Sequence, residues 1–223
     1  MIDASRFMTA ARPGPVVLTG RYGRVEKLDP SRHRASLWEA MRGEPALWDY
    51  MPYGPFASAG QFEAWIAERA TLADPYVYAV VALDGRALGI AALMRITPEM
   101  GVIEVGHIAY SPALQRTPLG TEAQFLLARY VFDTLGYRRY EWKCNALNAA
   151  SRRAAERYGF TFEGIFRQHM IVKGKNRDTA WYSIIDCEWP ARRAAFERWL
   201  APENFDAHGR QKAGLAAFMT IPG

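Results

Sequence analysis

One segment of the sequence places a strand, a short turn and the start of a helix in an order that suits phosphate binding. It reads Ile108-Ala109-Tyr110-Ser111-Pro112-Ala113-Leu114-Gln115-Arg116-Thr117-Pro118-Leu119-Gly120-Thr121-Glu122. The first turn of a helix offers N–H groups without partners and a partial positive charge, which both attract anionic oxygens. Arg116 adds a full charge, and Gly120 and Thr121 let a ligand approach the main chain closely. The segment therefore predicts a site for a phosphorylated ligand.

A second group of residues follows about 30 positions later, as Asn148-x-x-Ser151-x-x-x-Ala155-x-x-x-Gly159-Phe160. Asn148 is a good N-cap for a helix over residues 148–158. Ser151 then stands at the third helical position, where a purely local role is one alternative.

These two groups together resemble the GCN5-related N-acetyltransferase (GNAT) superfamily. Its pyrophosphate loop reads Gln/Arg-x-x-Gly-x-Gly/Ala after a strand ending in Val-x-Pro, and Tyr110-x-Pro112, Gln115 and Gly120 match that pattern. Pro118 replaces the first glycine and removes one N–H donor. The second group resembles the family's Asn-x-x-(Ala/Ser)-x-x-x-Tyr-x-x-x-Gly-Phe, with Ala155 in the tyrosine position.

Further short matches resemble the RimJ/RimL branch, which includes acetyltransferases of ribosomal-protein N-terminal amines. They are Gln115-Arg116-Thr117, Thr121-Glu122-Ala123, Ser151-Arg152-Arg153 and Arg177-Asp178 followed by Tyr182. The resemblance implies an N-acetyltransferase that moves acetyl from acetyl-CoA to a primary amine by direct attack in a ternary complex. The amine would belong to a protein N-terminus or a small molecule, and a homodimer is a family-level expectation. The alternative is a non-catalytic acetyl-CoA-binding module, which Pro118 and Ala155 keep open.

The resemblance also implies where acetyl-CoA binds. It would lie between the strands at 102–111 and 137–144, which family members splay apart, and its pantetheine would pair with the main chain. Main-chain N–H groups near Ile108 would polarise the thioester carbonyl. The implied cofactor-binding residues are Ile108, Tyr110, Gln115, Arg116, Thr117, Leu119, Gly120, Thr121, Asn148 and Ser151.

Glu104 is the candidate general base, because family members often place a glutamate there. Strand alternation predicts that it shares a face with Ile108, and that His107, a weaker candidate, points to the opposite face. Glu104 could instead be a structural carboxylate paired with an arginine.

Ser151 is the candidate donor to the leaving sulfur, because Ala155 offers no acid and Tyr158 has the wrong spacing. Water or no acid at all are the alternatives. Cys144, on an apolar strand, is expected to be a buried inert thiol rather than a nucleophile.

Composition narrows the alternatives. The net charge of +5 is spread along the chain, so no concentrated basic block predicts nucleic-acid binding. Two cysteines, no metal-ligand motif, no apolar run of membrane length and no secretory signal predict a reduced, metal-free cytoplasmic protein. A nicotinamide dehydrogenase is disfavoured, because no Gly-x-Gly-x-x-Gly follows a first strand.

The elements around these motifs alternate between strands and helices. We expect a mixed α/β fold with a mostly antiparallel, centrally splayed sheet of about seven strands and helices on both faces. A hairpin turn is predicted at Asp84-Gly85, a long helix at 118–135 and strand material at 160–162 and 167–173. Residues 1–15 are expected to be a loose arm, 16–190 the acetyltransferase domain, and 191–223 a C-terminal helix and a loosely ordered tail.

Overall fold

The computed structural model describes residues 7–219, whose strands and helices begin and end close to the signals in the sequence. The strands are β1 (Val17–Thr19), β2 (Gly23–Lys27), β3 (Tyr76–Ala82), β4 (Ala87–Thr97), β5 (Val102–Tyr110), β6 (Arg139–Asn145), β7 (Thr161–Val172) and β8 (Lys175–Ile185). The helices are α1 (Pro30–Met41), α2 (Ala59–Thr71), α3 (Pro118–Arg129), α4 (Ala149–Arg157), α5 (Trp189–Leu200) and α6 (Ala216–Met219). Asp29, Thr117 and Asn148 cap α1, α3 and α4 by accepting a main-chain N–H of the first turn.

The described strands form one eight-stranded sheet in the order β1-β2-β3-β4-β5-β6-β8-β7. All neighbouring strands are antiparallel except β5 and β6, which are parallel because α3 crosses between them. The predicted mixed, mostly antiparallel fold is therefore confirmed, with one strand more than expected.

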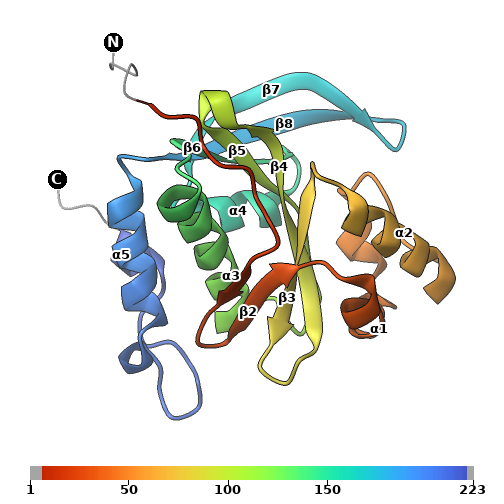
Figure 1. Ribbon diagram of the computed structural model, residues 1–223, viewed down its shortest axis with the longest axis horizontal. Coiled ribbons are helices and arrows are strands. Elements are labelled where there is room, and N and C mark those ends of the chain that lie inside the picture. Colours follow the sequence, from red (N-terminus) through yellow and green to blue (C-terminus); the bar gives the residue numbers. More distant parts are fainter. Residues whose placement is uncertain (1–6, 220–223) are drawn as a thin grey trace.

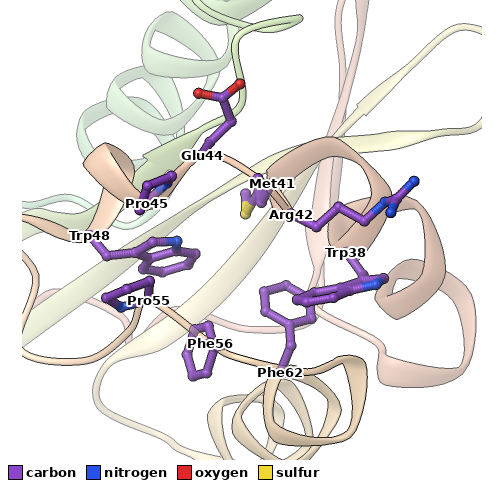
Figure 2. Close-up of a pocket in the computed structure, with 10 residues that line it drawn as sticks. Trp38, Met41, Arg42, Glu44, Pro45, Trp48, Pro55, Phe56 and Phe62 are labelled. Atoms are coloured by element: carbon purple, nitrogen blue, oxygen red, sulfur yellow. The ribbon is translucent and has the colours of Figure 1, made fainter.

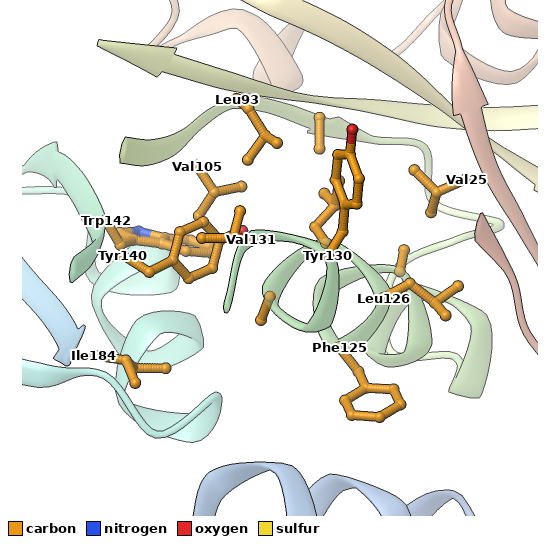
Figure 3. Close-up of a cluster of buried hydrophobic side chains, with 14 of the residues drawn as sticks. Val25, Leu93, Val105, Phe125, Leu126, Tyr130, Val131, Tyr140, Trp142 and Ile184 are labelled. Atoms are coloured by element: carbon orange, nitrogen blue, oxygen red, sulfur yellow. The ribbon is translucent and has the colours of Figure 1, made fainter. Parts of the chain in front are cut away.

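Helices cover the two faces of the sheet and create two hydrophobic clusters (Figure 1). On one face, α1 and α2 cover β3 and β4 through Leu37, Phe62 and Ile66. On the other face, α3 lies on the centre of the sheet. Figure 3 shows its Leu126 and Tyr130 close to the sheet and Phe125 pointing away from it. The Phe125 ring lies 5.5 Å from that of Phe196, so α5 forms an outer layer on α3.

A β-bulge interrupts β5 at His107 and Ile108. Gly106 pairs with Ala92 and Ala109 pairs with Ile90, so two residues of β5 face one residue of β4. His107 has a positive φ of 49°, which is uncommon for a residue other than glycine. The bulge reverses the alternation of side chains along the rest of β5.

Three local predictions differ from the structure. The hairpin turn at Asp84-Gly85 is present, but Ala82 N–H bonds Arg86 carbonyl at 2.9 Å, so three residues form the loop. The predicted break between residues 162 and 167 is absent, because bulges let β7 follow β8 along its length. The helix predicted over 118–135 is α-helical only as far as Arg129, and it continues as a π-helical turn over Tyr130–Thr134.

The predictions of a loose arm and a loosely ordered tail are wrong for their described parts. Ala10 N–H bonds Pro98 carbonyl at 3.1 Å, and Gly14 N–H bonds the Tyr130 hydroxyl at 3.1 Å. Near the other end, Leu215 is 1% exposed and belongs to the main core cluster. Residues 1–6 and 220–223 lie outside the described part of the chain.

Three observations bear on the expectations from composition. Cys144 is buried, Cys187 is exposed, and both are free thiols. No helix within residues 7–219 is both long and apolar enough to cross a membrane. Over the same residues, no group of three His, Cys, Asp or Glu side chains could hold a metal ion.

Glu122 is a buried carboxylate that ties the start of the sheet to α3. It accepts the main-chain N–H groups of Arg21 at 2.6 Å and Tyr22 at 2.8 Å. Glu122→Ala leaves two donors without partners, so we expect the free energy of unfolding to fall by about 3 kcal/mol in urea titrations.

Glu39→Ala is the matched control, because the Glu39 side chain is 61% exposed in its pair with Arg42. It should change the free energy of unfolding by less than about 0.5 kcal/mol. Equal effects of the two substitutions would show that Glu122 does not anchor the β1–β2 turn.

Candidate functional site

The sheet opens between β5 and β6, and this opening is the candidate site. The two strands pair over only four positions, from Val102 with Arg139 to Val105 with Trp142. Beyond them β5 stays on β4 and β6 stays on β8, and no ladder pair of the described chain joins residues 106–110 to residues 143–145. Each strand therefore turns one edge of main-chain N–H and C=O groups towards the other. Such an edge can hold an extended ligand as an added strand.

The N-terminus of α3 lies at the end of β5, beyond this opening. Thr117 accepts Gly120 N–H at 3.1 Å, and Pro118 takes the first helical position. No hydrogen bond within the described chain satisfies the N–H groups of Arg116, Thr117 and Leu119. Arg116 is exposed and has a φ of 60°, so the main chain turns at this residue. Its guanidinium adds a full positive charge beside the start of α3. Although Pro118 has no N–H, the N–H groups of Arg116, Thr117 and Leu119 remain available to bind a phosphate.

Gly120 allows this turn to pack tightly. A Cβ at Gly120 would lie 2.7 Å from the Leu114 carbonyl oxygen, closer than packed atoms come. Leu119 is 7% exposed, and its side chain packs towards Gly23 of β2, so only its main chain can serve a ligand. Leu119 can therefore offer a ligand only its main-chain N–H, whereas Gly120, whose N–H is bound by Thr117, contributes the close packing of the turn.

Two of the predicted cofactor residues bind each other. The Gln115 amide donates to the Tyr110 carbonyl at 2.8 Å, and the Tyr110 hydroxyl accepts from Gln124 at 2.7 Å. Burial raises the pKa of the Tyr110 phenol, which therefore stays protonated. Ile108 is half-buried on the α3 side of the sheet, as is Tyr110. Together these side chains form an apolar floor under the opening.

Arg157 is a basic residue of the site that sequence reasoning missed. It lies in the last turn of α4, and its guanidinium donates to the Thr121 hydroxyl at 3.1 Å. Thr121 is 3% exposed, so this contact brings a second positive charge to the first turn of α3. No local pattern in the sequence identifies such a contact across 36 residues.

The start of α4 faces the other side of the opening. Asn148 accepts Ser151 N–H at 3.0 Å, which confirms its capping role. The Ser151 hydroxyl accepts from the Trp142 indole of β6 at 3.0 Å and also hydrogen-bonds the Cys144 thiol. Burial raises the pKa of Cys144, so this thiol is protonated and a poor nucleophile. Ala155 is fully buried and contributes only packing.

Glu104 lies on β5 just before the bulge and is 2% exposed. One of its oxygens, Oε2, accepts from Arg95 at 2.7 Å and from Lys143 at 3.1 Å. Lys143 also pairs with Glu141 of the same strand at 2.6 Å, so the lysine bridges two buried carboxylates. Burial raises the pKa of Glu104, and Lys143 and then Arg95 oppose that rise. The arginine pairing predicted as one alternative is therefore present, together with a lysine.

The bulge makes the predicted faces wrong. Ile108 packs on the α3 side, away from Glu104, whereas His107 lies on the same side as Glu104. The His107 ring stacks on Tyr53 with centroids 5.5 Å apart, and Nδ1 lies 2.7 Å from the Tyr53 hydroxyl. Burial, followed by the charge of Arg69, lowers the pKa of His107 to about 4. His107 is therefore a neutral imidazole at physiological pH.

Residues 43–57 form the wall on the Glu104 side. Trp48 is 3% exposed and packs edge-on against Trp65, so much of this aromatic segment is core. Figure 2 shows Trp48, Phe56 and Phe62 around a cavity of about 190 Å³, which lies beside the opening rather than within it. The segment is also tied down, because Lys173 of the β7–β8 turn donates to the carbonyls of Trp48 at 2.9 Å and Gly54 at 2.7 Å.

Comparison with known proteins agrees with this geometry. The family model for the acetyltransferase (GNAT) domain matches residues 25–161. A GCN5-related N-acetyltransferase from Brucella melitensis is 48% identical over 96% of this chain and 98% of its own, with a TM-score of 0.93. A probable acetyltransferase of the GNAT family from Chromobacterium violaceum is 41% identical over 86% of this chain and 96% of its own, with a TM-score of 0.80.

A more distant structure shares the fold. RimL, a ribosomal L7/L12 alpha-N-protein acetyltransferase solved in complex with coenzyme A, is 20% identical over 77% of this chain and 99% of its own, with a TM-score of 0.66. No curated protein matches the chain. Because the family match extends over most of the chain and close relatives share its whole length, this protein belongs to the GNAT family and is an acetyltransferase.

Proposed function

We propose that this protein transfers the acetyl group of acetyl-CoA to a primary amine by direct attack in a ternary complex. One observation carries the proposal: β5 and β6 separate after four pairs, and the helix with unpaired main-chain N–H groups begins at the end of β5. An extended pantetheine can pair with an open strand edge, and a diphosphate can bind at a helix N-terminus. The acetyltransferase family supports the same assignment.

The turn at residues 115–121 suits a diphosphate. The N–H groups of Arg116 and Leu119 have no acceptor among residues 7–219, and the guanidinium of Arg157 already reaches Thr121. Bound acetyl-CoA would supply an acetyl group activated as a thioester, whose thiol leaves with a pKa near ~8.5. Main-chain N–H groups of the bulge near Ile108 are our candidates for polarising the thioester carbonyl.

Glu104 is our candidate for the proton acceptor from the attacking amine, directly or through water. Its Oε2 holds Arg95 and Lys143, whereas its Oε1 makes no hydrogen bond within the described chain. A modest base suffices, because a free α-amine has a pKa of about 7.7–8. His107 is a weaker candidate, because its lowered pKa makes it a poor proton acceptor at neutral pH.

Ser151 is our candidate donor to the departing sulfur. Trp142 donates to its oxygen, which leaves the hydroxyl hydrogen to donate elsewhere, at present to Cys144. Tyr158 is a poor alternative, because burial raises its pKa and it already hydrogen-bonds Thr121 and Arg157. A leaving thiolate needs little protonation, so we assign Ser151 a supporting role.

Arg116→Gln tests the phosphate site, because Arg116 is exposed at the turn and pairs with no described carboxylate. Calorimetry should show coenzyme A binding to the wild type and a roughly 5- to 10-fold weaker affinity for the variant, with a smaller difference at high salt. Arg167→Gln removes the same charge from the exposed β7 and should leave the affinity unchanged. Equal affinities of wild type and Arg116→Gln would place the phosphates elsewhere.

Glu104→Gln tests the general base. We expect kcat to fall by about 10²- to 10³-fold because the proton acceptor is removed, while coenzyme A affinity is retained because Glu104 lies on the face opposite α3. Glu141→Gln is the control, because Glu141 is also buried and also pairs with Lys143. Its kcat should change by less than about threefold. A kcat for Glu104→Gln within twofold of the wild type would remove Glu104 from the mechanism.

The lowered pKa of His107 predicts a pH dependence of stability. The unfolded chain binds a proton at a pKa near ~6.5, and the folded protein binds it at about 4, so stability falls as the pH drops through this interval. His107→Gln removes this effect. The stability advantage of the wild type over the variant should therefore be about 2 kcal/mol smaller at pH 4.5 than at pH 7. A constant difference in urea titrations would mean that His107 titrates normally.

A further inference from the structure

Arg177 of β8 is a cation that lacks a counter-ion within residues 7–219. It forms no ion pair with any described carboxylate, and its buried Nε has no hydrogen-bond acceptor. The neighbouring Asp178 is occupied, because it accepts the Gln168 N–H at 2.8 Å and the Asn176 amide at 2.9 Å. Burial lowers the pKa of Arg177, which reflects the loss of water around a group that stays charged. Such a desolvated charge is unfavourable unless an anion joins it.

Arg177 lies on the face of the sheet that carries Glu104. Residues 177, 179 and 181 point to the same side of β8 by strand alternation. Trp181 pairs with Lys143, whose ammonium lies 4.0 Å from the indole centroid and also contacts Glu104. Electrostatic interactions of Arg177 reach Glu104, Cys144 and His107. The guanidinium is therefore close to the opening, on the side opposite α3 and α4.

Other donors on this side also lack acceptors. The indole Nε1 of Trp181 and the Nε of Arg69 are both buried without a hydrogen-bond partner. Arg69 lies over the Tyr53 ring at 5.8 Å, and its charge acts on His107 as that of Arg177 does. Buried N–H groups without acceptors are rare in folded proteins, and several in one region indicate a missing acceptor.

Arg177 differs from the other cations of this region, because it alone among them forms no ion pair within the described residues. Arg95 and Lys143 share Glu104, Lys143 also pairs with Glu141, and Arg69 pairs with Glu68. Asp74 accepts the main-chain N–H groups of Arg95 at 2.9 Å and Ile96 at 3.0 Å. These four cations and four carboxylates are equal in number, but each carboxylate already has partners, whereas Arg177 pairs with no described carboxylate.

From these contacts, and resting on the proposed amine acetylation, we infer that the acceptor carries a carboxylate that binds Arg177. Phosphates of the coenzyme would lie at the N-terminus of α3, on the other face, so the acceptor approaches from the Arg177 side. A planar guanidinium matches a carboxylate through two parallel hydrogen bonds. Arg177 is therefore a substrate-binding residue that selects amino acids or short acidic amines over neutral amines.

Contacts at two places hold the segment at 43–57 on this side of the sheet. Lys173 ties the β7–β8 turn to the segment at 43–57, as described above. The Tyr50 hydroxyl donates to the Leu147 carbonyl at 3.3 Å, which joins the same segment to the loop before α4. The segment at 43–57 is thus held at both the β7–β8 turn and the β6–α4 loop.

The test compares pairs of primary amines that differ only in a carboxylate or the matching carboxamide, such as glycylglycine and glycylglycinamide. Rates are corrected for the fraction of neutral amine. For the wild type, KM should be roughly 10- to 100-fold lower for the acid than for the amide. Arg177→Gln should raise KM for the acid to that of the amide without changing kcat or the KM of the amide. Arg177→Lys keeps the charge but not the paired donors of the guanidinium. Its KM for the acid should lie between those of the wild type and of Arg177→Gln.

Lys175→Gln is the control, because it removes the same charge from an exposed position of the same strand. It should keep the wild-type preference. Turnover with equal KM for acid and amide, or an unchanged preference in Arg177→Gln, would overturn this inference and leave amine acetylation standing. Absence of turnover with every amine, despite coenzyme A binding, would instead overturn the proposed function and this inference with it.

Discussion

The separation of β5 and β6 after four residue pairs is the feature on which the rest of the site depends. A parallel pair that continued to Tyr110 would close the sheet and leave no strand edge for a ligand. The bulge at His107 and Ile108 changes the direction and twist of β5 where pairing with β6 ends. Strain at the positive φ of His107 is offset by stacking and a hydrogen bond with Tyr53. The opening is therefore built into the backbone.

The two faces of the sheet have different chemistry around this opening. On one face, α3 and α4 contribute free main-chain N–H groups, Arg157 and Ser151, which suit a phosphorylated cosubstrate. On the other face, a ladder of alternating charges runs from Arg95 through Glu104 to Lys143. The reacting groups would meet only in the gap between the strands. This arrangement would keep the two proposed anion sites, one at the start of α3 and one at Arg177, on opposite faces of the sheet.

Local signals in the sequence predicted most of the fold. The cap at Asn148, the hairpin turn at Asp84-Gly85 and the start of the helix at residue 118 depend on neighbouring residues, so they can be predicted from short windows. The bulge could not be predicted, because a positive φ is uncommon for any residue other than glycine and the rest of the segment has an ordinary strand pattern. Because the positive φ of His107 was not predicted, Ile108 and His107 were expected on the wrong faces of the sheet. For the same reason, the stacking of His107 on Tyr53 was not predicted.

The candidate site was predicted best where it consists of main chain. The turn around Gly120 and the cap at Asn148 lie where the motifs placed them. Partners of charged side chains were missed, because contacts such as Arg157 with Thr121 join residues far apart in sequence. The pairing of Glu104 with an arginine was one of two stated alternatives, but Lys143 was not foreseen. Long side chains reach across several strands, so their partners depend on the tertiary fold.

A crystal structure of the protein with coenzyme A bound tests the central claim most directly. The account predicts a pantetheine arm hydrogen-bonded to the main chain of β5 between residues 106 and 110, and a diphosphate at the N-terminus of α3. The sulfur would lie between β5 and β6, close to Ser151. A coenzyme bound anywhere else, or strands β5 and β6 that pair along their whole length in the complex, would contradict it.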